Sequence, residues 1–235
     1  MNHLFFAYSK LRFRQKVVMV ISLIAFLLGS GLTWMEQTYA EEKPRLAILP
    51  FVIERGEDPG KGIICPLCKG IYRGGEILSG SGQVMTRSLY QKMEAMGVFN
   101  LLPVEKVEEI LPLQDMKIFK EQPMSQSIQS GRKLEVHFIM AGFIFRFEER
   151  IGSSIGVSRP ASVGFDLHLL RLRDGMEVWR GKFDETQRPL SENLFKIGSF
   201  FRRKAHWLTA EELAGVGMDE MLKKLPGIQE LEEIK

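Results

Sequence analysis

The sequence predicts an α/β fold in which helices flank a mixed β-sheet. Three observations predict it. Apolar runs alternate with amphipathic helical segments in the first half of the chain, a strand meander occupies about residues 136–183, and helical segments follow the meander. Alternating strands and helices that give way to antiparallel strands are typical of a mixed sheet covered by helices.

The meander begins with a nearly unbroken apolar run over Val136–Phe147. Its far end alternates, and the phenylalanines and isoleucines favour a strand over a helix. A run of this kind is typical of a strand that is covered on both faces. We therefore expect this segment to lie inside the sheet.

The next two strands are expected over Ser162–Phe183, where apolar and polar residues alternate on either side of Asp174-Gly175. This dipeptide tolerates positive φ and predicts a type I′ hairpin turn. The alternation slips where Leu169 and Leu170 are adjacent. Either a β-bulge or a strand end buried on both faces would explain the slip.

The remaining elements follow from apolar periodicity and from helix-ending residues. Thr209 and Glu212 have the spacing of a capping box. The expected elements are a strand over Arg45–Ile53, a helix over Gln83–Met96, a strand over Val98–Leu102, and helices over Val104–Leu111, Ser125–Glu135, Ser191–Lys204 and Thr209–Leu225.

We expect residues 1–40 to be a targeting segment and residues 41–228 to form one domain. A glycine-rich loop over residues 54–82 is expected as an insertion in that domain, and residues 229–235 as a frayed tail. A loop of this length in a compact domain is usually functional or disordered.

The amino-terminal segment has the pattern of an export signal. Basic residues precede an apolar run over Val17–Leu28, and Thr38–Ala40 offers small residues for cleavage. Alternatively, residues 17–34 form an uncleaved inner-membrane tether. Both of these interpretations predict an extracytoplasmic, periplasmic location, and a buried helix of a soluble protein is the third alternative.

The charge of the chain argues against a nucleic-acid-binding protein. The formal net charge is +3, and residues 1–40 carry Lys10, Arg12, Arg14 and Lys16 against Glu36. The remainder is therefore close to neutral, whereas nucleic-acid binding needs concentrated positive charge.

Cys65 and Cys68 form the sharpest local motif, Cys-Pro-Leu-Cys, within the glycine-rich loop. A local disulfide fits an oxidising compartment. Half of a zinc ribbon is the second interpretation, and it would need His137, His168, His206 or a second chain to complete four ligands. A dithiol redox site and free thiols stay open. No other cofactor is expected.

No catalytic signature is present, so we expect a protein that is not an enzyme. Asp166 and His168 share one strand face, as acid–base pairs do, but no nucleophile pattern accompanies them. We expect a solvated or partner-facing polar sheet face there. Phosphate-loop and nucleophile-elbow spacings are missing.

Several short apolar motifs resemble a family of envelope proteins. They are Leu46–Phe51, Gly97–Phe99, Gly131–Leu134, Met140–Gly142 and Leu167–Trp179. Together they resemble the superfamily that contains the curli-secretion lipoprotein CsgG and the penicillin-binding-protein activator LpoB, and the amino-terminal domain of TolB is similar. The resemblance implies a periplasmic α/β domain that binds other envelope proteins. The chain lacks a lipobox cysteine, and its Ile151–Pro160 turn is too short for the pore hairpins of the curli protein.

The resulting expectation is an envelope accessory or scaffold protein that binds a secretion, outer-membrane or cell-wall component. The alternatives are a thiol or zinc site at Cys65 and Cys68, and a structural subunit of a homo-oligomer. The expected partner surface joins the glycine-rich loop to the Ile151–Pro160 turn. Its candidate residues are Gly60, Gly62, Gly74, Gly75, Ser153, Ser154 and Arg159.

Overall fold

A computed structural model describes residues 42–56, 62–111, 122–188 and 206–234. The expected targeting segment and the expected helix over Ser191–Lys204 lie outside the described residues. Within the described ranges, no helix has the length and apolar character needed to cross a membrane.

The central sheet is mixed, as the sequence predicts. Its strand order is β10-β9-β6-β1-β5, and β2 also pairs with β6. β6 runs parallel to β1 and β2 and antiparallel to β9. The strands are β1 (Arg45–Ile48), β2 (Val52–Ile53), β5 (Asn100–Leu101), β6 (Phe138–Glu148), β9 (Ser162–Arg171) and β10 (Met176–Thr186).

The meander of β6, β9 and β10 confirms the expected centre of the fold. β9 is buried along its whole length, and β6 is buried except at its last residue. The expected phase slip is a β-bulge at Val178 of β10, opposite Leu169 and Leu170. The prediction of a type I′ turn is wrong, because such a turn needs positive φ at both central residues. Gly175 has φ of 72°, but Asp174 is not among the described non-glycine residues with positive φ.

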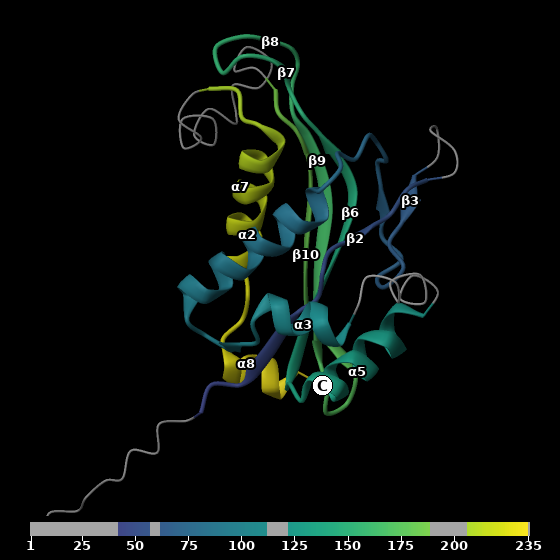
Figure 1. Cartoon of the computed structure of the whole chain (residues 1–235), viewed down its shortest axis with the longest axis vertical. Coiled ribbons are helices and arrows are strands. Elements are labelled where there is room, and N and C mark those ends of the chain that lie inside the picture. The colour runs from purple at the N-terminus through teal and green to yellow at the C-terminus, as the bar shows by residue number, and fades with distance from the viewer. Residues whose placement is uncertain (1–41, 57–61, 112–121, 189–205, 235) are drawn as a thin grey trace, which may run out of the picture. The chain divides into compact units, whose positions relative to one another are not determined.

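Helices cover both faces of the sheet (Figure 1). Side chains of α2 (Ser81–Met96), α7 (Ala210–Leu222) and α8 (Ile228–Glu233) belong to one core cluster. Side chains of α3 (Val104–Ile110) and α5 (Pro123–Leu134) pack into the cluster on the opposite face. The second cluster also contains Ile63, Cys65 and Tyr72 of the glycine-rich loop.

Local sequence signals explain the ends of the two longest helices. Gly97 ends α2 in the left-handed conformation, with its N–H donating to Met93 and Glu94 carbonyls. The capping box of Thr209 and Glu212 begins α7 with both of its hydrogen bonds. The buried stripe of α2 includes Met85, Leu89 and Met93, which belong to the core, whereas Met96 at the end of the helix is exposed.

The loop over residues 54–82 is more regular than expected. It contains a small antiparallel hairpin formed by β3 (Ile63–Ile64) and β4 (Ile71–Tyr72). The expected turn over Ile151–Pro160 is a second small hairpin, formed by β7 (Ile151–Gly152) and β8 (Val157–Arg159). Figure 1 shows the β7–β8 hairpin beyond one end of the main sheet and β3 beside the sheet.

The carboxyl-terminal end packs against the rest of the protein. The prediction of a frayed tail over residues 229–235 is therefore wrong for residues 229–234, which the structure describes. Leu231 of α8 is fully buried. Arg171, which is 2% exposed, donates to the carbonyls of Leu231, Glu232 and Ile234 and pairs with Asp174 at 2.6 Å. A buried guanidinium with five N–H donors can satisfy several terminal carbonyls at once.

Replacing Arg171 with glutamine should remove these charge-assisted hydrogen bonds. We expect the free energy of unfolding to fall by about 2–3 kcal/mol, measured by urea denaturation. Hydrogen exchange of the α8 amides should also rise. Arg173→Gln is the control: its guanidinium is 57% exposed, and it should cost less than about 1 kcal/mol. Equal losses for the two variants would contradict this role of Arg171.

Candidate metal centre

The β3–β4 hairpin presents Cys65 and Cys68 in the tight turn between its strands. The N–H of Cys65 donates to the Gly70 carbonyl at 2.8 Å, and the N–H of Lys69 donates to the Cys65 carbonyl at 3.0 Å. Lys69 adopts φ of 59°, a left-handed conformation that reverses the chain. A hairpin turn follows the motif in place of the helix start at which redox cysteines gain thiolate character.

Backbone N–H groups of the turn point at both sulfur atoms. The N–H of Cys68 lies 3.5 Å from Sγ of Cys65, and the N–H of Gly70 lies 3.4 Å from Sγ of Cys68. Hydrogen bonds to sulfur favour its negatively charged form. The turn therefore offers one backbone N–H donor to each sulfur atom.

The hairpin packs its inward face on the sheet through Tyr72. The Tyr72 ring stacks on Phe145 of β6, with centroids 3.9 Å apart and an interplanar angle of 12°. The Lys182 ammonium of β10 lies 4.1 Å from the centroid of the Tyr72 ring and donates to the Ile71 carbonyl. These contacts place the cysteine turn over the polar residues of β9.

Asp166 and His168 project from β9 into the space under the turn. We expected a solvated or partner-facing sheet face here, and this prediction is wrong: Asp166 is 1% exposed and His168 is fully buried. The shared face was predicted correctly. The cover supplied by the hairpin could not be seen in the alternation of β9, because it comes from a segment about a hundred residues earlier.

Four side chains converge from the hairpin and from β9. Sγ of Cys65 lies 3.5 Å from Nε2 of His168, and Sγ of Cys68 lies 3.8 Å from Oδ2 of Asp166. Nε2 of His168 is 3.1 Å from Oδ1 of Asp166. Donor atoms of all four residues lie within 4.8 Å of one another.

Glu177 of β10 supports His168 from the opposite side. Its Oε1 lies 2.6 Å from Nδ1 of the imidazole, and its Oε2 accepts from Arg180 at 2.8 Å. When Nδ1 carries the only proton of the ring, Nε2 is left as a lone-pair donor facing the cysteines. The sequence analysis missed Glu177, although its place just after the predicted hairpin turn put it close to His168 across the strands.

Burial and mutual contacts shift the pKa values within this cluster. Burial raises the pKa of the Cys65 thiol to about 11, although its contact with His168 acts in the opposite direction. Burial alone would lower the pKa of His168, but contacts with Asp166, Cys65 and Glu177 raise it to about 11. Without an ion, an imidazolium therefore balances the neighbouring carboxylates.

Both cysteines are free thiols in the structure. The local disulfide stays a prediction, since no observation tests the oxidation state. The other histidines considered as ligands lie elsewhere: Nδ1 of His137 accepts from the N–H of Arg45, and Nε2 of His206 lies 3.9 Å from Glu212. Of the three histidines considered, the structure brings His168 to the cysteines.

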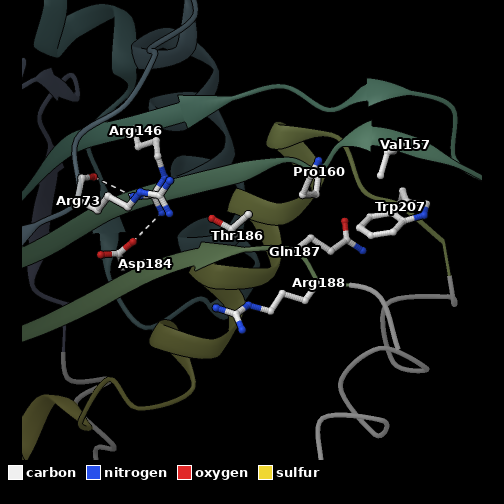
Figure 2. Close-up of a pocket in the computed structure, with 9 residues that line it drawn as sticks. All are labelled: Arg73, Arg146, Val157, Pro160, Asp184, Thr186, Gln187, Arg188 and Trp207. Atoms are coloured by element: carbon white, nitrogen blue, oxygen red, sulfur yellow. Dashed lines mark hydrogen bonds and ion pairs between the residues drawn. The ribbon is translucent and has the colours of Figure 1, made fainter. Parts of the chain in front are cut away.

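A second polar site adjoins β10 and holds a cavity of about 610 Å³ (Figure 2). The buried Arg146 guanidinium donates to the Asp184 carboxylate, the Ser162 hydroxyl and the Arg73 carbonyl at 2.6, 2.6 and 2.8 Å. Gln187 binds the backbone of residues 206 and 208. These polar groups already bond to other residues of the protein. Their arrangement therefore needs no bound ligand to explain it.

The expected partner-binding residues are spread over both hairpins and the segment that follows β4. Arg159 at the end of β8 pairs with Glu76 at 3.5 Å and so joins the two regions. Gly60 lies outside the described residues, and Gly74 is half-buried. The exposed candidates are Gly62, Gly75, Ser153, Ser154 and Arg159.

No family model and no curated protein matches the chain. Solved structures that are similar to it include the PelC dodecamer from Paraburkholderia phytofirmans, which is 11% identical in sequence. The match covers 78% of this chain and 88% of the PelC chain, with a TM-score of 0.42. Lipoprotein GNA1162 from Neisseria meningitidis has 13% identity, 69% and 96% coverage, and a TM-score of 0.40.

The LpoB C-terminal domain from Salmonella enterica is also similar, with 13% identity, 62% of this chain and 84% of that chain covered, and a TM-score of 0.37. The resemblance to CsgG and TolB stays a prediction. At these identities, the likeness concerns the fold.

Gly75→Ala should test how tightly the segment after β4 lies on the sheet. A Cβ at Gly75 would stand 2.3 Å from Oε1 of Glu148 and 2.5 Å from Cγ of Arg146. We expect overpacking to lower the free energy of unfolding by about 1–3 kcal/mol. The control is Gly156→Ala, where a Cβ meets nothing within 4 Å and the change should stay within about 0.5 kcal/mol. Urea denaturation measures both, and a neutral Gly75→Ala would contradict the close approach.

Proposed function

We propose that this chain is an extracytoplasmic accessory protein that binds another protein of the cell envelope and does not catalyse a reaction. The observation that carries the proposal is the placement of the exposed isoleucines. Large apolar side chains that gather on the surface mark protein interaction sites.

Four of the five large apolar side chains that are exposed within the described ranges lie on the two small hairpins. Ile64 and Ile71 are on β3 and β4, and Ile151 and Ile155 are on β7 and the turn after it. Ile71 is 68% exposed and Ile155 is 92% exposed. The fifth, Met96, lies at the end of α2.

The two hairpins present these side chains on supported backbones. Ile64 and Ile71 form a cross-strand pair that points away from the sheet, while their neighbours Ile63 and Tyr72 are buried. In the second hairpin, the Ser153 hydroxyl accepts from the N–H groups of Ile155 and Gly156. A supported apolar side chain loses less conformational entropy on binding than one on an unstructured loop.

The extracytoplasmic part of the proposal is supported by the amino-terminal pattern of basic residues, apolar run and small residues at Thr38–Ala40. The near-neutral remainder of the chain is compatible with a protein partner. The motif resemblance points to the same class, a binding domain of the envelope. Whether the partner belongs to secretion, the outer membrane or the cell wall is the finer part of the proposal.

Affinity capture of the tagged full chain from cross-linked cells, followed by mass spectrometry, should identify one stoichiometric envelope partner. Ile71→Ser and Ile155→Ser should each weaken binding of that purified partner roughly 10- to 30-fold, because a central apolar contact contributes about 2 kcal/mol.

Met96→Ser is the matched control, because it removes an exposed apolar side chain outside the two hairpins. It should leave the affinity unchanged, and circular dichroism should show all three variants folded. Recovery of the chain alone, or equal affinity for the wild type and both isoleucine variants, would contradict the proposal. Recovery of only further copies of the chain would instead support the homo-oligomer.

A further inference from the structure

We propose that Cys65, Cys68, Asp166 and His168 bind one zinc ion that fastens the β3–β4 hairpin to the central sheet. This site is independent of the partner-binding proposal. It rests on the residue types, on the distances between their donor atoms and on an unsatisfied carboxylate oxygen.

The residue types select a transition metal. Two thiolates, one imidazole and one carboxylate form a donor set that zinc binds in proteins, whereas calcium and magnesium require mainly oxygen ligands. The Cys-x-x-Cys spacing lets one short turn supply two ligands from the same side. Asp166 and His168 are two residues apart on β9 and therefore lie on the same face of the sheet. They supply the other two ligands from the sheet that the turn covers.

The spacing of the donor atoms fits a tetrahedral ion. Zinc–ligand bonds of about 2.0–2.3 Å imply about 3.4–3.8 Å between neighbouring ligand atoms of a tetrahedron. The measured separations are 3.5 Å from Cys65 to His168, 3.8 Å from Cys68 to Asp166 and 3.1 Å from His168 to Asp166. All separations are within 4.8 Å, so side-chain shifts would bring the four donors to one ion.

Oδ1 of Asp166 is a buried carboxylate oxygen whose neighbour among the described residues is the imidazole of His168. It is buried, and no aligned hydrogen bond reaches it, although Nε2 of His168 is only 3.1 Å away. A buried carboxylate oxygen without a partner is costly. A cation among the four side chains would satisfy it directly.

The groups around the four ligands suit a bound ion. Glu177 holds Nδ1 of His168 so that Nε2 faces the ion, an arrangement that is common for histidine ligands of zinc. Two thiolates and Asp166 would exceed the zinc charge by one, and the further negative charge of Glu177 is balanced by Arg180 at 2.8 Å. The N–H groups directed at the two sulfur atoms stabilise the thiolates.

The role of such an ion is structural. Four protein ligands leave no open position for water or substrate, as in zinc sites that stabilise a fold. The hairpin has only two residues in each strand, and a hairpin of this size has little stability of its own. The ion would therefore add a strong link between the hairpin and β9.

The test uses the full chain without a histidine tag, purified under reducing conditions from cells grown with zinc. Mass spectrometry of the metals should find about one zinc per chain. Substitution with cobalt should produce thiolate charge-transfer absorption and the intense visible bands of four-coordinate cobalt. Cys68→Ser and Asp166→Asn should lose stoichiometric zinc, and His137→Gln should retain it, since His137 lies outside the cluster.

Glu177→Gln keeps the proposal testable if a ligand variant fails to fold. It should still bind zinc but with an affinity roughly 10- to 100-fold lower in a chelator competition. Glu76→Gln, whose carboxylate pairs with Arg159, is its control and should bind as the wild type does. Three results would each overturn the proposal: zinc-free protein with Cys65 and Cys68 oxidised to a disulfide, zinc-free protein with free thiols, or equal zinc in the wild type, Cys68→Ser and Asp166→Asn.

Discussion

The burial of β9 on both faces is the constraint on which the other parts of this structure depend. Every residue of this strand is buried, yet it carries Ser162, Asp166, His168 and Arg171. A polar group removed from water must find a partner inside the protein, because an unmatched group costs several times what a typical hydrogen bond contributes. The central strands can therefore exist only with the segments that supply those partners.

Three of these contacts hold a segment from outside the central strands. Arg171 gathers the last carbonyls of the described chain, and Arg146 of β6 holds the backbone at Arg73. Asp166 and His168 meet the cysteine turn. Since these contacts join residues far apart in the sequence, they place the carboxyl end, the loop after β4 and the β3–β4 hairpin on one sheet.

The same packing relates the two proposals without making one depend on the other. The inward side of the β3–β4 hairpin carries Cys65 and Tyr72, and its outward side carries Ile64 and Ile71. The alternation of a strand explains this separation, because neighbouring side chains point to opposite faces. A metal link on one side and a partner on the other can therefore coexist, and each can be present without the other.

The sequence by itself determined the mixed sheet, the meander, the capping box of α7 and the candidacy of Cys65 and Cys68, since these depend on local periodicity and short spacings. It also placed Asp166 and His168 on one face. Only the tertiary structure decided that the cysteine turn covers this face, that Glu177 supports His168 and that α8 is anchored. Strand alternation specifies which side chains share a face, but which distant segment covers that face depends on long-range packing.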